Sequence, residues 1–310
     1  MHRLCQHACR SGQGIICTLL LGVTMVSCSP YRVVKIPSSN QSERIDYVVI
    51  HFTSETFADS MRLLTKPSDN PVSTHYLIPE SADETYFRSA PVIHQLVEEP
   101  KRAWHAGVSY WDGADSLNDR SIGIELVNTS RCTIEEADAE ALESIGAICR
   151  FEPFDERQLE LLVRLLNEIL ERYPGIDPVD VVGHSDIAPE RKMDPGPQFP
   201  WRRLHELGIG AWFDAPTRER YARHFEVSPP DTLALQAALA AYGYNLTPNG
   251  EWNAGARKVV RAFQMHFTPE NVTGEPDVAT ASAVFALLEK YKPDSLEQIL
   301  EQFPERSGSD

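Results

Sequence analysis

The part of the chain that decides its fold is the run Ile45-Asp46-Tyr47-Val48-Val49-Ile50-His51-Phe52. Its residues are almost continuously apolar and rich in β-branched and aromatic side chains, which predicts a buried strand. Three further runs, Thr74–Pro79, Ser121–Val127 and Asp180–Gly183, predict additional strands. A sheet is therefore expected at the centre of this part of the chain.

A helix is predicted between residues 155 and 173, where apolar residues recur with helical spacing. Asp155 and Gln158 suit a capping box at its start, and Pro174-Gly175 ends it. Strands mixed with helices over residues 44–213 indicate an α/β domain.

A second, all-helical domain is predicted at residues 228–292, after Pro229-Pro230. Its three expected helices are 231–242, 254–267 and 277–291. The remaining residues, 293–310, are acidic and are expected to form a frayed tail.

The composition limits the kind of partner. The chain has 310 residues, which suggests two domains with ample sequence for a buried core. Its 42% hydrophobic and 24% charged residues are ordinary for a globular protein. The net charge of −16 argues against nucleic acid as a partner, because phosphate binding needs a basic surface.

The N-terminus has the pattern of a secretory signal, with Arg3 and Arg10 before an apolar stretch at 15–26. This stretch ends at Val26-Ser27-Cys28, which resembles the bacterial lipoprotein processing box. Residues 1–27 would then be the signal peptide, Cys28 the lipid attachment site, and 28–43 a polar tether. Under the same resemblance, Ser29 favours the periplasmic face of the outer membrane in a Gram-negative bacterium. The alternative is a plain secretory signal with a chance cysteine.

Cys132 and Cys149 are the cysteines that remain after the N-terminal group. In an oxidising periplasm they could form a disulfide that closes a loop of about 17 residues and contributes about 3 kcal/mol. The alternative is a pair of buried, unpaired thiols.

Three polar residues lie where folding alone would not place them. His51 is near the end of an apolar strand, His184 follows the strand at 180–183, and Asp194 comes ten residues later. Two imidazoles and a carboxylate form a catalytic Zn²⁺ set that leaves a fourth position for water. Taken singly, each has an ordinary explanation, since a strand-end histidine is usually structural and Asp194 before Pro195 can cap a turn.

The sequences around these residues strengthen the metal interpretation when they are read together. In chain order they are Val49-Ile50-His51-Phe52-Thr53, Ala103-Trp104-His105-Ala106-Gly107, Ser121-Ile122-Gly123-Ile124-Glu125, Gly183-His184-Ser185-Asp186-Ile187 and Lys192-Met193-Asp194-Pro195-Gly196. This series resembles the type 2 N-acetylmuramoyl-L-alanine amidases, which are related to phage lysozyme-amidases and peptidoglycan recognition proteins. The resemblance covers about 45–213 and implies a mixed central sheet flanked by helices.

The resemblance also implies roles for individual residues. His51, His184 and Asp194 match the three zinc ligands of the family. Glu125 matches the general base of its glutamate branch, and Lys192 matches the lysine that stabilises the developing oxyanion.

Other positions match the family outside the metal set. Trp104 and His105 match its cleft wall, where they could contact sugar or peptide, although packing is an equal alternative for Trp104. His75 matches a position in the fold, and Thr74 stands where the phage branch has a catalytic tyrosine, which favours Glu125 as the base. His94, His205, His224 and His266 have no motif support and are interpreted as structural.

The helical domain resembles the three-helix peptidoglycan-binding domain that accompanies many wall hydrolases. The residues that carry this are Asn249-Gly250-Glu251-Trp252, Val259-Val260-Arg261-Ala262-Phe263-Gln264 and Gly274-Glu275-Pro276-Asp277. Asn249, Asn253 and Ala256 depart from the usual Asp, Gly and Thr. The alternative is a purely structural appendage.

Together these resemblances imply a zinc-dependent, lipid-anchored amidase that cleaves the amide between N-acetylmuramic acid and L-alanine in peptidoglycan or muropeptides. The main alternative is a peptidoglycan-binding lipoprotein without catalysis. A second alternative is a cytoplasmic recycling amidase, which the signal segment disfavours.

Overall fold

The computed structural model describes residues 34–40, 44–132 and 149–303. The chain divides into two compact units, Met1–Gln41 and Ser42–Asp310. The predicted signal segment and Cys28 lie outside the described residues. Of the predicted tether, residues 34–40 are exposed and have no regular secondary structure.

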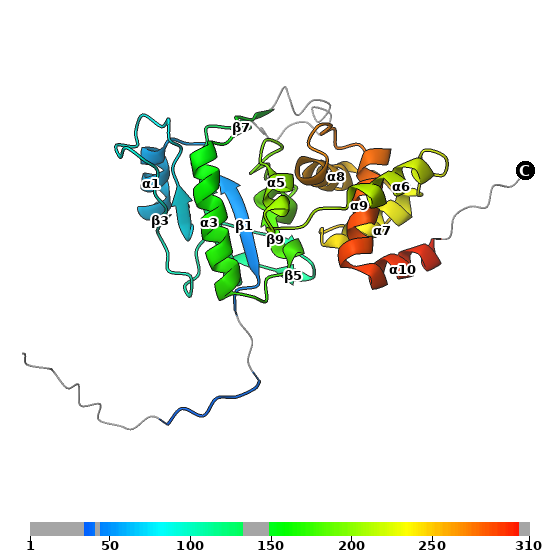
Figure 1. Ribbon diagram of the computed structural model, residues 1–310, viewed down its shortest axis with the longest axis horizontal. Helices are drawn as coiled ribbons and strands as arrows, with labels where there is room; N and C mark the ends of the chain where they lie inside the picture. Colours follow the sequence, from blue (N-terminus) through cyan, green and yellow to red (C-terminus); the bar gives the residue numbers. More distant parts are fainter. Residues whose placement is uncertain (1–33, 41–43, 133–148, 304–310) are drawn as a thin grey trace, which may run out of the picture. The chain divides into compact units, whose positions relative to one another are not determined.

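The second unit contains a five-stranded mixed sheet, which confirms the predicted fold class (Figure 1). Four neighbouring strands are parallel, and the strand at one edge is antiparallel to them. In spatial order the strands are β3 (His94–Gln95), β2 (Tyr76–Ile78), β6 (Ser121–Leu126), β1 (Tyr47–Phe52) and β9 (Val181–Gly183). Strand β1 is thus an inner strand of the sheet, with a parallel partner on each side.

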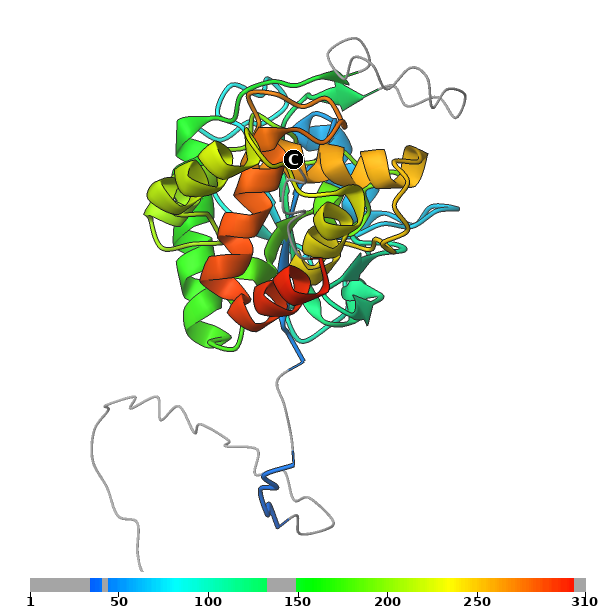
Figure 2. The same cartoon turned by 90° about the vertical axis from the view of Figure 1, so that its right-hand side faces the viewer.

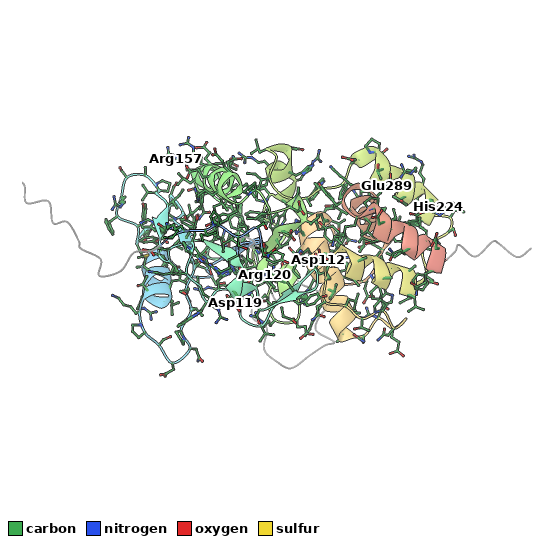
Figure 3. All side chains as sticks on the ribbon, turned by 90° about the horizontal axis from the view of Figure 1, so that it is seen from below. Asp112, Asp119, Arg120, Arg157, His224 and Glu289 are labelled. Carbon is green, nitrogen blue, oxygen red and sulfur yellow. The ribbon has the colours of Figure 1, made fainter. Side chains whose placement is uncertain are left out.

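Helices cover the two faces of this sheet because the strand side chains alternate between them. On β2, Ile78 belongs to the main core with helix α3 (Glu156–Arg172), whereas Leu77 packs with Phe57 of helix α1 (Phe57–Thr65). Figure 3 shows α3, marked by Arg157, and α1 on opposite sides of the sheet.

The start of α3 differs in one respect from the prediction. Asp155 caps the helix, and its side chain accepts a hydrogen bond from the Arg157 amide. Gln158 does not return a bond to the cap, so the predicted capping box is wrong. It is buried instead, and its Nε2 donates to the carbonyls of Ile78 and Val127 at 2.9 Å each. Buried carbonyl groups require hydrogen-bond donors, and the Gln158 side chain turns toward these two carbonyls instead of toward the helix end.

Two small hairpins accompany the sheet. They are β4 (Tyr110–Trp111) with β5 (Ala114–Asp115), and β7 (Arg131–Cys132) with β8 (Cys149–Arg150). Cys149 is disulfide-bonded, and the antiparallel register places the backbone of Cys132 opposite it. This register is compatible with the predicted Cys132–Cys149 disulfide, which stays a prediction.

The helical domain contains the three helices that the sequence predicts, within one residue at each end. They are α7 (Thr232–Tyr242), α8 (Ala254–Phe267) and α9 (Val278–Tyr291) (Figure 2). Each begins at a side-chain cap, supplied by Asp231, Asn253 and Asp277 respectively. Asn253 stands where the resemblance has Gly, and its Oδ1 atom accepts from the Ala256 amide at 3.0 Å, so this departure preserves the helix start.

The prediction of a frayed tail from residue 293 is wrong for its first part. Pro293–Gln302 forms helix α10, in which Leu296 and Ile299 are buried. Pro293 occupies the first helical position, where its missing N–H costs nothing, and the two apolar residues lie one turn apart on the face that packs. Residues 304–310 lie outside the described residues.

Helix α6 (Ala215–Phe225) was not predicted, because most of its residues are polar or charged and it contains few large apolar side chains. Tyr221 and Phe225 contact Phe285 of α9, and Arg220 forms an ion pair with Glu289, also on α9 (Figure 3). The helical domain therefore includes residues before 228, the position at which the sequence predicts that it begins.

Two short helices connect the sheet to the helical domain, α4 (His184–Ile187) and α5 (Trp201–Glu206). Asp186 of α4 is buried, and its carboxylate accepts from the Tyr244 hydroxyl at 2.6 Å and from His266 Nδ1 at 2.8 Å. The ring of His266 also stacks on Trp201 at 3.9 Å. The helical domain thus supplies two partners of a buried carboxylate in the sheet domain, which makes the two halves one structural unit.

No helix in the described ranges combines the length and the hydropathy needed to cross a bilayer.

The Asp186 contact gives a prediction for stability. Tyr244→Phe should lower the free energy of unfolding by about 1–3 kcal/mol, because Asp186 loses a donor while it stays buried. Urea unfolding of the full chain measures the effect. Tyr110→Phe is the matched control, since no hydrogen bond of its hydroxyl occurs among the described residues. Equal stability of the two variants would contradict the role assigned to this bond.

Candidate active site

The parallel strands bring the predicted ligands together at one edge of the sheet. His51 lies near the carboxyl end of β1, and His184 is the first residue of α4, directly after β9. Because β1 and β9 are parallel neighbours, their carboxyl ends meet. Asp194 lies in the loop that follows α4. Ligand sites in α/β sheets commonly form at this edge.

The three side chains form a compact donor set. The His51 Nδ1 and His184 Nδ1 atoms are 2.9 Å apart, and each is close to Asp194 Oδ2, at 3.0 and 3.1 Å. All three residues are buried. Ligand atoms at 2.0–2.1 Å from one Zn²⁺ ion are themselves about 3 Å apart, so this triangle fits such an ion.

The protonation states also fit a cation. Burial, reinforced by His184, lowers the pKa of His51 to about 4, and burial also lowers the pKa of His184. Burial alone would raise the pKa of Asp194, but the two histidines hold it well below its usual value. At neutral pH the set therefore consists of two neutral imidazoles and a carboxylate, the forms that bind metal.

Glu125 lies beside this set on the neighbouring strand. The register of β1 and β6 pairs it with His51, so both side chains leave the same face of the sheet. Its Oε2 atom is buried and has no hydrogen-bond partner among the described residues. Burial, with a contribution from Asp194, raises the pKa of Glu125 to about 8, and Lys192 opposes the shift.

Lys192 is half-buried in the loop between α4 and Asp194. Its positive charge opposes the rise in the pKa of Glu125 and contributes to lowering the pKa values of His51 and His184. The ammonium group is therefore close enough to the donor set to act on it electrostatically.

Two parts of the chain match known protein families. Residues 41–197 match the N-acetylmuramoyl-L-alanine amidase family, and residues 228–284 match a peptidoglycan binding domain family. The N-acetylmuramoyl-L-alanine amidase AmiD of Escherichia coli strain K12 is 44% identical over 252 residues, which are 81% of this chain and 85% of AmiD. The chain belongs to the N-acetylmuramoyl-L-alanine amidase family.

Solved structures of this family agree with the fold of the amidase described here. AmpDh3 from Pseudomonas aeruginosa has a TM-score of 0.74 at 41% identity, covering 86% of this chain and 99% of its own. AmiD from E. coli has a TM-score of 0.69 at 42% identity, covering 83% and 93%. Both similarities extend over most of the chain, and hence over both domains.

Trp104 and His105 differ in their exposure to solvent. The Trp104 side chain is 49% exposed, so the predicted contact with sugar or peptide stays a prediction. His105 is buried, with Nδ1 3.0 Å from His51 Nε2 and Nε2 3.2 Å from Ser121 Oγ. Both ring nitrogens are engaged inside the protein, which does not fit the predicted place in the cleft wall.

The other histidines lie apart from the donor set. His75 is fully buried, accepts from the Gly123 amide through Nδ1 and donates to the Lys101 carbonyl through Nε2. Thr74 donates to the Gly123 carbonyl. The Gly123 contacts are with strand β6 and the Lys101 contact is with a loop, so both side chains are bonded to the backbone of the fold. His266 is also structural, through its bond to Asp186.

Sequence reasoning missed three residues that support the site. Asn118 and Ser121 hold the loop and ring of His105, and Arg191 donates to the carbonyls of Ala106 and Val108. None has a metal-binding side chain or stands out by spacing. Arg191 adjoins Lys192 in the loop, which is the one signal that could have pointed to it.

Proposed function

We propose that the chain uses Zn²⁺ to hydrolyse the amide between the lactyl group of N-acetylmuramic acid and L-alanine, in remodelling or recycling of the cell wall. The observation that carries this proposal is the buried triangle of His51 Nδ1, His184 Nδ1 and Asp194 Oδ2. Beside it lies Glu125 Oε2, which has no hydrogen-bond partner among the described residues.

The similar proteins support a muropeptide as substrate. The AmiD structure contains anhydro-N-acetylmuramic acid-L-Ala-D-γ-Glu-L-Lys, and the AmpDh3 structure contains an anhydromuramic pentapeptide. Both ligands include the muramic acid group and stem peptide that the proposed reaction would separate.

The proposed chemistry assigns one task to each group. A bound Zn²⁺ ion acts as a Lewis acid that polarises the amide carbonyl and acidifies water. Glu125, whose Oε2 atom is buried beside the donor set, would take the proton of the attacking water and return it to the leaving amine. Lys192 stabilises the negative charge that develops on the carbonyl oxygen.

The metal part of the proposal is tested by ligand substitution. His51→Ala, His184→Ala and Asp194→Ala should each lose bound zinc and activity together, as measured by elemental analysis and by mass spectrometry of digested peptidoglycan. Chelation of the unmodified protein should remove activity, and added Zn²⁺ should restore it. His205→Ala, which changes a histidine bonded to the Gly210 carbonyl and remote from the donor set in the sequence motifs, should keep both properties. Full activity of the chelated, metal-free protein would contradict the proposal.

The role of Glu125 is tested separately from metal binding. Glu125→Gln should keep zinc but lower kcat by about 10²–10⁴-fold, because an amide cannot accept the proton. Glu160→Gln, on the exposed surface of α3, is the control and should behave as the unmodified protein. A Glu125→Gln protein with unchanged kcat would refute the assignment of the base.

We further propose that lipid at Cys28 anchors the protein to the outer membrane. The support is the apolar stretch that ends at Val26-Ser27-Cys28. Cells that express the full chain should incorporate radiolabelled palmitate into it, and Cys28→Ala should abolish the label. Equal labelling of the Cys28→Ala protein would contradict this site.

A further inference from the structure

One short loop lies behind both imidazoles of the proposed metal site. His105 Nδ1 is 3.0 Å from His51 Nε2, and the carbonyl of the next residue, Ala106, is 3.2 Å from His184 Nε2. In each case the contact is made with the ring nitrogen that does not face the donor triangle. Two consecutive residues thus engage both candidate ligands.

The proton positions in this arrangement follow from one requirement. A neutral histidine that offers Nδ1 to a metal carries its proton on Nε2. His51 Nε2 must then donate to His105 Nδ1, which leaves the His105 proton on Nε2. That proton is donated to Ser121 Oγ, 3.2 Å away, and the Ser121 hydroxyl donates to the Leu117 carbonyl at 2.6 Å. In this series of hydrogen bonds, from His51 to the Leu117 carbonyl, every donor has an acceptor.

The tautomer of His184 is fixed in the same way, by a single hydrogen bond. His184 Nε2 carries the proton and donates it to the Ala106 carbonyl. A carbonyl can only accept, so this hydrogen bond requires the His184 proton on Nε2. An Nη atom of Arg191 donates to the same carbonyl and lies 3.5 Å from His184 Nε2.

The loop itself is fixed by the sheet and by Asn118. The Asn118 Oδ1 atom accepts from the amides of His105 and Ala106 at 3.0 and 2.8 Å. The His105 ring lies against Gly123 of β6, where a Cβ atom would be 2.4 Å from His105 Cγ. Only glycine leaves room for the ring at this position.

We propose that His105 is a positioning residue for the amidase reaction, which holds His51 in the tautomer and orientation that present Nδ1 to the metal. The Ala106 carbonyl does the same for His184. The inference rests on the proposed zinc site. Groups that orient metal ligands from behind typically contribute 10–100-fold to metal affinity or activity.

The primary test compares His105→Leu with His105→Asn in the full chain. Leucine removes the acceptor for His51 Nε2–H, so the zinc Kd, measured by competition with a chromogenic chelator, should rise about 10–100-fold. The visible absorption of the Co²⁺-loaded variant should also change, since it reports ligand orientation. Asparagine, whose oxygen can take the place of Nδ1, should restore most of the affinity and the spectrum.

A matched control separates positioning from general damage to the core. His75→Leu changes a second buried histidine beside Gly123 whose bonds are to the backbone and not to a ligand. It should leave the zinc Kd of the folded protein and the Co²⁺ spectrum unchanged. If His105→Leu does not fold, Ser121→Ala gives the test one step further from the metal, because it removes the acceptor for His105 Nε2–H together with the bond that the same hydroxyl donates to the Leu117 carbonyl. A rise in the zinc Kd of that variant supports the inference, and an unchanged Kd overturns it.

The outcomes distinguish this inference from the function on which it rests. If the unmodified protein binds no zinc, the proposed function fails. If it binds zinc, and His105→Leu has the same Kd and the same Co²⁺ spectrum, the positioning role is overturned and the proposed function stands. A raised KM for muropeptide with unchanged zinc affinity would likewise overturn it, and would return His105 to the substrate cleft.

Discussion

The site depends on the parallel register of β1 with its two neighbours. This register pairs His51 with Glu125 of β6 and brings the end of β9, and so His184, to the same edge. A shift by one residue would turn His51 toward the face covered by α3 and remove it from the site. The apolar residues that alternate with His51 and Glu125, such as Ile50 and Ile124, prevent this shift because they are fully buried on that other face.

At this edge of the sheet several ionisable side chains are buried together, and those of the donor set are stabilised by their neighbours. Asp194 stays ionised because two histidines face it, and both histidines are held from behind by the loop at 105–106. The helical domain contributes from the other side. Tyr244 and His266 bind Asp186, two residues after His184, so the helix that begins with a candidate ligand is fixed by both domains. The domain similar to peptidoglycan-binding modules is therefore also part of the support of the active site.

Elements with strong local signals were predicted well, and those that depend on distant contacts were not. The helix at 155–173 and the three helices of the second domain have clear periodicity and caps, and the structure confirms them. The local pattern predicts a capping box with Gln158, but in the structure its side chain donates to the carbonyls of Ile78 and Val127 instead. Pro293–Gln302 is a helix rather than a tail because the domain supplies a surface for Leu296 and Ile299.

The sequence by itself determined the four parallel strands of the sheet, the family and the candidate ligand set, because strand patterns and motif residues are local features. Only the tertiary structure decided which polar residues surround that set. His51 and His184 are 133 residues apart, and nothing local says that their ring nitrogens come within 2.9 Å. The family resemblance implies a place in the cleft wall for His105, yet its ring packs over Gly123 and contacts His51. Such contacts are set by the packing of strands and loops from distant parts of the chain, which no single segment encodes.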